Sequence, residues 1–299
     1  MNRAKLTFLG TGTSQGVPMI GCSCDVCKSA DPRDKRLRAS VLVDFAGMRI
    51  LVDAGPDFRQ QMLREGVTHV DAILLTHNHK DHTGGLDDIR AFNYIEKRAL
   101  EIYCEKYVEN ALRQEYSYAF AEKKYPGAPE WHVHNIDENP FTIRAGGPYE
   151  TLTWDQGKGY IKSIAGENDP VHTAQIIPIR GMHYKLPVLG YRFGNIAYCT
   201  DMNHIPEEEF KKLEGLDHFV INCVKYGKHI SHFSIEEAIE VAKRVGARHT
   251  WLTHLSHQLP RHAELESELQ ANTHLELSSE QSTNQITSIL PAYDGLVIE

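Results

Sequence analysis

Four side chains that can bind a metal ion fall within six positions, in the run His77-Asn78-His79-Lys80-Asp81-His82. Imidazole nitrogens mixed with a carboxylate suit Zn, Mn or Fe. The run follows residues 72–76, an apolar segment that predicts a buried strand. Because rigid folds usually place reactive groups on loops at strand ends, the run is a candidate reactive loop. We predict that His77 and His79 bind one ion, and that Asp81 and His82 bind a second.

A second metal-binding pattern lies near the beginning of the chain, where Cys22, Cys24 and Cys27 stand within six positions. The first ten residues have the composition of a strand rather than a signal peptide, so we expect a cytoplasmic protein. In that compartment, clustered cysteines indicate metal binding before disulfide bonds. Structural zinc takes four ligands in tetrahedral geometry, so a fourth ligand must come from elsewhere in the chain.

The segments that must position these groups alternate between strand-like and helical patterns, with several hairpins. This alternation favours a layered mixed α/β fold over a purely parallel sheet. The glycine-rich segment 10–16 lacks the spacing of a nucleotide-binding loop, and we interpret it as a tight turn near the site. Strands are predicted at 6–9, 40–45, 48–53, 72–76, 173–179, 191–199, 218–222 and 296–298, and helices at 57–65, 105–122, 235–245 and 260–270.

Composition bounds the remaining possibilities. The 299 residues are 41% hydrophobic and 24% charged, which is typical of a folded protein, and no apolar stretch is long enough to span a membrane. We predict a single domain over residues 1–299, with an inserted segment at approximately 105–170. The net charge of −8 argues against extensive electrostatic binding of nucleic acid. If the chain oligomerises, a homodimer is the form we expect.

The pattern His-x-His-x-Asp-His resembles the signature of the metallo-β-lactamase-fold hydrolases. Further segments resemble that family's other motifs in the same order, so the resemblance covers nearly the whole chain. It implies an α/β fold with four layers, an αβ/βα sandwich. The matching segments are Leu51-Val52-Asp53-Ala54-Gly55, Gly181-Met182-His183, Cys199-Thr200-Asp201 and Leu252-Thr253-His254.

This resemblance also implies a site for two divalent ions, Zn, Mn or Fe, that share a bridging hydroxide. Asp53 would support the metal-binding loop without binding an ion. Asp81 would count among the catalytic residues as well as among the ligands. The implied ligands are His77, His79 and His183 for one ion, Asp81, His82 and His254 for the other, and Asp201 between the two.

The cysteine cluster narrows the resemblance to the PhnP-type phosphodiesterases of the same superfamily. In those proteins three N-terminal cysteines and a histidine beside the last metal motif hold a separate zinc. The resemblance therefore implies a structural zinc bound by Cys22, Cys24, Cys27 and His257, which stands three positions after His254.

His232 is the candidate general acid. It precedes Ser234-Ile235-Glu236-Glu237, a capping box that predicts a helix N-terminus, where backbone N–H groups favour an anion. An imidazolium there could protonate a leaving alkoxide, and the matching histidine of PhnP-like and tRNA-processing relatives has that role. His229 is a weaker candidate.

Taken together, these features predict a dinuclear metal-dependent phosphodiesterase. Its expected substrates are small phosphodiesters, either cyclic nucleotides or cyclic ribose phosphates. Three alternatives stay open: a tRNA 3′-processing endonuclease, a thioester hydrolase, and a non-catalytic zinc protein of cofactor biosynthesis. The mixed charge of the insert argues against the first, and the intact run from His77 to His82 argues against the last.

Overall fold

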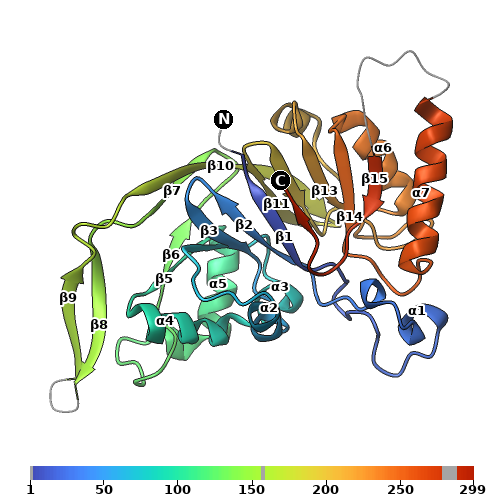
Figure 1. The fold of residues 1–299 in the computed structure, drawn as a ribbon. Coiled ribbons are helices and arrows are strands. Elements are labelled where there is room, and N and C mark those ends of the chain that lie inside the picture. Colours follow the sequence, from blue (N-terminus) through green and yellow to red (C-terminus); the bar gives the residue numbers. More distant parts are fainter. Residues whose placement is uncertain (1–2, 156–158, 278–287) are drawn as a thin grey trace.

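Two seven-stranded sheets face each other in this computed structural model, which describes residues 3–155, 159–277 and 288–299 (Figure 1). The first sheet has, in order across it, β16 (Val297–Ile298), β1 (Lys5–Gly10), β2 (Ser40–Phe45), β3 (Met48–Val52), β4 (Ala72–Leu74), β5 (Leu100–Cys104) and β6 (Trp131–Asn135). The second has β15 (Ser288–Pro291), β14 (His249–Thr253), β13 (His218–Asn222), β12 (Ile196–Cys199), β11 (Leu186–Phe193), β10 (His172–His183) and β7 (Phe141–Ala145).

Helices cover the outer face of each sheet, which completes the four predicted layers. The first sheet carries α2 (Phe58–Arg64), α3 (Lys80–Thr83), η2 (Leu86–Ile89), α4 (Arg90–Glu96), α5 (Lys106–Glu115) and η3 (Ser117–Ala119). The second carries η4 (Glu207–Leu213), α6 (Ile235–Val245) and α7 (His262–Leu277). The short α1 (Asp25–Lys28) and η1 (Pro32–Asp34) belong to the segment between β1 and β2.

Both faces of each sheet are buried, and the strand sequences show why. Successive side chains of a strand point to opposite faces. In β2, Val41 and Val43 pack into the core between the sheets, whereas Leu42 packs against the helices outside the first sheet. The central strands are therefore apolar at nearly every position, as expected where both faces are covered.

Parallel pairing decides where the loops meet. Strands β3 to β6 run parallel in the first sheet, and β12 to β15 run parallel in the second. Carboxyl ends of parallel strands lie at one edge of a sheet, so the segments that follow β3, β4, β12 and β14 can converge. Open α/β sheets bind ligands at that edge.

Two predicted elements differ from the structure. The single strand expected at 191–199 is two antiparallel strands, β11 and β12, because Gly194 takes a positive φ of 56° and turns the chain. The helix expected at 105–122 ends at Glu115 and continues only as the short η3.

Residues 105–170, the predicted insert, contribute α5 to the helices outside the first sheet, β6 to the first sheet and β7 to the second sheet. They also form an antiparallel hairpin, β8 (Tyr149–Asp155) and β9 (Gly159–Ala165), that projects from one end of the molecule (Figure 1). Residues 156–158 of this segment lie outside the described part of the chain. No helix of the described residues is long and apolar enough to cross a membrane.

Candidate metal centre

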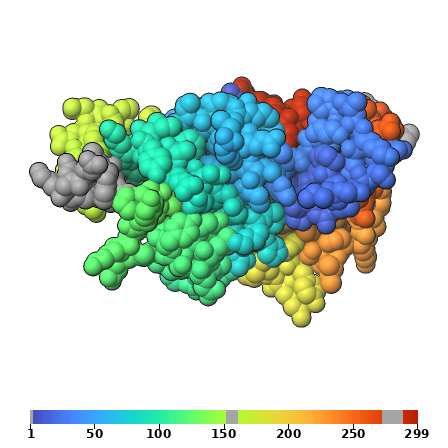
Figure 2. All heavy atoms as spheres, turned by 90° about the horizontal axis from the view of Figure 1, so that it is seen from below, coloured from blue at the N-terminus to red at the C-terminus, as the bar shows by residue number. Residues whose placement is uncertain are grey.

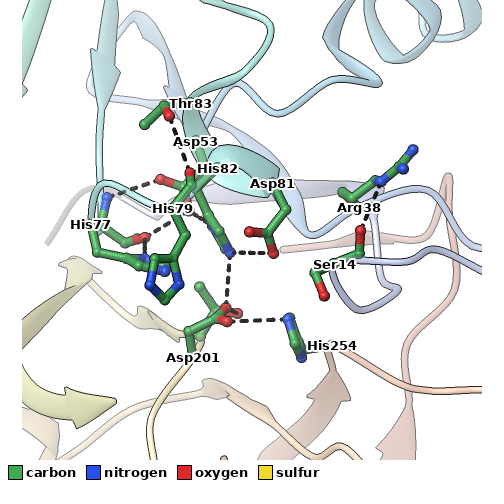
Figure 3. Close-up of polar contacts among 12 residues, drawn as sticks. Ser14, Arg38, Asp53, His77, His79, Asp81, His82, Thr83, Asp201 and His254 are labelled. Atoms are coloured by element: carbon green, nitrogen blue, oxygen red, sulfur yellow. Dashed lines mark hydrogen bonds and ion pairs between the residues drawn. The ribbon is translucent and has the colours of Figure 1, made fainter. Parts of the chain in front are cut away.

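The side chains expected to bind the two ions meet at the carboxyl edge of the strands (Figure 3). Within each of two groups, the possible ligand atoms lie within 4.8 Å of one another. His77 and His79 follow β4, and His183 ends β10. Asp201 follows β12, and His254 follows β14. The groups are His77, His79 and His183, and Asp81, His82, Asp201 and His254.

Left-handed backbone directs several of these side chains. Asp53, Asp201 and His254 each follow a strand, with positive φ angles of 64°, 56° and 56°. Non-glycine residues seldom adopt this conformation, which concentrates at functional sites where surrounding contacts maintain it. The turn after each strand thus fixes the direction of a side chain that the site uses.

Asp53 links two of these segments. Its Oδ1 accepts the backbone N–H of Thr76 at 2.9 Å, and its Oδ2 lies 2.7 Å from Nδ1 of His82. The carboxylate is fully buried and thereby orients the imidazole of His82 toward Asp201. Gly55 permits this packing, because a Cβ there would lie 2.0 Å from the carbonyl oxygen of Asp81. Asp53 therefore connects Thr76 to His82, as a residue that supports the metal-binding loop would.

Buried nitrogens without hydrogen bonds test whether this site fits metal ions. The Nε2 atoms of His77 and His82, and both ring nitrogens of His254, are buried and form no hydrogen bond. Buried polar groups are otherwise almost always hydrogen-bonded. His82 Nε2 and His254 Nε2 lie 3.2 Å and 3.1 Å from oxygens of Asp201. Buried imidazole nitrogens beside carboxylates are the donor set that divalent transition metals take.

The electrostatics of the pocket favour a cation. Burial alone would lower the pKa of His82, but the carboxylates of Asp201, Asp81 and Asp53 outweigh it and raise that pKa well above its ordinary value. Burial lowers the pKa of His77, which therefore stays neutral, as a metal ligand must be. The pocket thus combines a neutral imidazole at His77 with carboxylates that stabilise positive charge at His82.

Ser231 contacts three histidines, and the sequence pattern gave no sign of this. Its carbonyl oxygen lies 2.8 Å from Nδ1 of His183, and its N–H donates to Nδ1 of His229 at 3.3 Å. Its Oγ lies 3.2 Å from Nδ1 of His232. When this hydroxyl donates to Nδ1, the remaining ring hydrogen of His232 is on Nε2, which faces Oδ1 of Asp201 at 3.1 Å.

The environment of His232 differs from the expectation in two respects. Burial and the neighbouring His254 lower the pKa of His232 to about 3, so the ring is neutral and not an imidazolium. The predicted capping box is present, but Ser234 N–H donates to Glu237 and Glu237 N–H donates to Ser234. Ile235 N–H donates to the carbonyl of Lys225. These three N–H groups donate within the chain, so they would not bind a phosphate.

His183, Asp201 and His232 also form a group whose ligand atoms lie within 4.8 Å of one another. The geometry of His232 therefore allows either of two roles, proton donation or metal binding.

The cysteine cluster and His257 form a separate group of possible ligands. His257 Nδ1 lies 3.3 Å from Cys22 Sγ and 3.5 Å from Cys24 Sγ. Hydrogen bonding from the Cys27 backbone, then from His257, lowers the pKa of the Cys24 thiol to about 6, whereas burial raises that of Cys27 to about 11. Three sulfurs and one nitrogen are the donor set of a closed structural zinc site.

The glycine-rich segment 10–16 connects these two regions. The Thr11 carbonyl accepts the N–H of Leu255 at 2.8 Å, and the Thr11 N–H donates to Asp294. The segment therefore holds the chain between His254 and His257, as a tight turn near the site. The hydrogen-bonding groups of Thr11 are occupied in this way.

Asp53→Asn tests the supporting role of this carboxylate. The amide oxygen can still accept from Thr76, but the negative charge beside His82 is lost. We expect the affinity for active-site metal to fall about 10- to 100-fold, the usual effect of removing a group that orients a ligand. Calorimetric titration with the metal ion measures this affinity. Asp44→Asn, near the end of β2, is the matched control. Unchanged affinity would contradict the assigned role.

Comparison with known proteins agrees with the fold. The beta-lactamase superfamily domain matches residues 48–255. A crystal structure described as a new diphosphatase from the PhnP family has a TM-score of 0.76 and 34% identity, covering 99% of this chain and 98% of that one. Zn(2+)-bound PqqB from Methylobacterium extorquens has a TM-score of 0.63 at 17% identity, with 99% of each chain covered, which indicates a shared fold.

An octanoyltransferase from Porphyromonas gingivalis is 40% identical over 260 residues. The match covers 86% of this chain but 47% of that protein. The chain thus spans about half the length of this relative.

Proposed function

The chain belongs to the beta-lactamase superfamily and to its PhnP branch, and from this premise we propose that it is a metal-dependent phosphodiesterase acting on small phosphodiesters. Asp201 carries the proposal, because its two oxygens lie 3.2 Å and 3.1 Å from the buried Nε2 atoms of His82 and His254. Cyclic nucleotides and cyclic ribose phosphates are the expected substrates.

The proposal gives each group of side chains one role. His77, His79 and His183 would hold one divalent ion, and Asp81, His82 and His254 a second, with Asp201 between them. Zn, Mn and Fe all suit these ligands, and the ions would polarise the phosphoryl group and activate water. The four ligands of the cysteine group would hold a structural zinc.

Once protonated, His232 would transfer the Nε2 proton to the departing oxygen and return to its neutral form. Its ring is neutral beside Asp201, and an anionic phosphate brought next to it would raise its pKa, since opposite charge favours the charged form. Asp53 and Ser231 orient His82 and His232, so these residues would act through the side chains they contact.

His232→Ala provides a test that depends on the leaving group. General acid catalysis contributes about 10²- to 10⁴-fold when the leaving group is poor. We therefore expect at least about a hundredfold loss of kcat on an alkyl phosphodiester, and a much smaller loss with p-nitrophenolate, which leaves without protonation. His229→Ala is the matched control. Equal losses on both substrates would instead favour metal binding by His232.

A substrate panel tests the proposed function. The metal-reconstituted protein is assayed on bis(p-nitrophenyl) phosphate, 2′,3′-cyclic AMP, a diphosphate diester and an octanoyl thioester. We expect hydrolysis of the first two. The diphosphate diester is included because a PhnP-family relative is described as a diphosphatase. Hydrolysis of a diphosphate bond, like that of a phosphodiester, proceeds by attack on phosphorus.

Thioester hydrolysis is the second candidate. The 40% identity to an octanoyltransferase favours acyl chemistry, although more than half of that protein lies outside the match. Hydrolysis of the octanoyl thioester alone would overturn the phosphodiesterase proposal. Transfer RNA is not expected as substrate, since the chain has a net charge of −8.

A further inference from the structure

Exposed side chains stand beside the buried histidines at one side of the metal centre. Tyr184 directly follows His183 in the turn between β10 and β11, and it is 52% exposed. Ile230 directly precedes Ser231 and is 67% exposed. His183 and Ser231 are hydrogen-bonded to each other, so the two exposed residues flank one contact of the site. We call Tyr184, Lys185 and Ile230 the rim cluster.

One side-chain amide holds the rim cluster together. Asn203 Oδ1 accepts the backbone N–H of Tyr184 at 2.9 Å, and Asn203 Nδ2 donates to the carbonyl of Ile230 at 3.1 Å. The backbone N–H of Asn203 donates to Met182 at 2.8 Å. The carboxamide of Asn203 therefore bridges the backbones of Tyr184 and Ile230.

Tyr184 has the backbone conformation of the residues that build the site. Its φ is +59°, in the region that favours glycine. A bulky side chain in this region is an outlier, and such outliers cluster at active sites and ligand-binding positions. Asp53, Asp201 and His254, at the same edge, also have positive φ. The side chains of those three residues belong to the metal centre, whereas the aromatic ring of Tyr184 has no role in metal binding.

The rim cluster offers binding groups of a different kind from those of the metal centre. The ammonium of Lys185 lies 5.3 Å from the centre of the Tyr184 ring, so a cation and an aromatic ring stand together. In Figure 2 the yellow segment that contains this turn stands out from the edge of the molecule. A ligand that reaches both regions has an anionic end for the metal centre and an apolar group for the rim.

We propose that the rim cluster binds the organic group of the substrate, and that this group is a nucleobase that stacks on Tyr184. The inference rests on the proposed phosphodiesterase function and specifies its substrate class as a nucleotide. Lys185 would contact the anionic oxygens of the same nucleotide, and Ile230 would pack against the base or its ribose. A ring with an adjacent ammonium favours a planar, anionic ligand over an alkyl chain.

Tyr184→Gly separates recognition from folding, because glycine adopts the positive φ readily. The holoenzyme and this variant are compared on 2′,3′-cyclic AMP and on a ribose cyclic phosphate without a base. We expect kcat/KM for the nucleotide to fall about tenfold, mainly through KM, since stacking on an aromatic side chain contributes roughly this much. The baseless substrate should be hydrolysed at an unchanged rate. The melting temperature should stay the same or rise.

Two further measurements make the result decisive. Tyr184→Phe keeps the ring and should keep the preference for the nucleotide. Inhibition by AMP should weaken about tenfold in Tyr184→Gly, whereas inhibition by ribose 5-phosphate should not change. If the wild type hydrolyses both diesters and the glycine variant has the same ratio of rates, this inference is overturned and the proposed function stands. If the wild type hydrolyses neither diester, the proposed function fails.

Discussion

Asp201→Ala should abolish hydrolysis and remove the active-site metal ions while leaving the zinc of the cysteine group in place. Oδ1 of Asp201 faces His232 and His254, and Oδ2 faces His82. Loss of this carboxylate removes the group that lies between the two sets of ligands in the proposed arrangement. Metal catalysis stabilises the transition state by several kcal/mol, so we expect a loss of about a thousandfold or more in kcat/KM.

Metal analysis distinguishes this effect from unfolding. The wild type should contain three metal ions per chain, and Asp201→Ala should retain about one. Glu240→Ala, on the exposed side of α6, is the control and should keep all three. Circular dichroism should show the same secondary structure in each variant. A variant that kept full metal content and more than a tenth of the activity would refute the shared role of Asp201.

Cys24→Ser should lower the melting temperature by about 10 °C. Structural zinc contributes strongly to folding free energy, and several kcal/mol corresponds to a shift of this size in a chain of this length. Cys24 lies between β1 and β2, whereas His257 follows β14, so this contact joins two segments that are far apart in the sequence. Without the metal, the two segments would be joined there only by weaker contacts, such as the hydrogen bond of Leu255 to Thr11.

The same substitution should also weaken the active site, because His257 and His254 share one short segment. We expect the affinity for the active-site ions to fall about tenfold, as when a supporting group is removed. Cys104→Ala is the matched control, since this buried cysteine belongs to none of the possible ligand groups among the described residues. It should lower stability but keep three metal ions. Equal metal content in both variants would exclude a zinc on Cys24.

The spacing of residues along the chain was sufficient to predict several local features of this protein. The run from His77 to His82 brings four potential ligands into one loop, and the apolar segment before it predicts the strand that supports the loop. The capping box at Ser234 and the hairpin of β2 and β3 were likewise predictable, because they depend on residues a few positions apart. The alternation of strands and helices indicated the layered fold for the same reason.

The meeting of distant segments depended on tertiary packing. Spacing along the chain says nothing about the distance between Asp81 and Asp201, and only the resemblance to a known family suggested that they share a site. Packing of the two sheets brings the carboxyl ends of β4, β10, β12 and β14 to one edge, and left-handed turns then direct the side chains.

The hydrogen-bonding context of each side chain was also decided in three dimensions. The sequence indicated a helix N-terminus after His232 but could not show that burial keeps its imidazole neutral. Nor could it show that Ser231 contacts three histidines, or that Asn203 joins Tyr184 to Ile230.

Residue types and their order determined which chemistry is available to this protein, because a ligand's chemistry belongs to its side chain. Tertiary structure decided which groups act together, because hydrogen bonding, burial and charge depend on neighbours that the fold brings from remote parts of the chain.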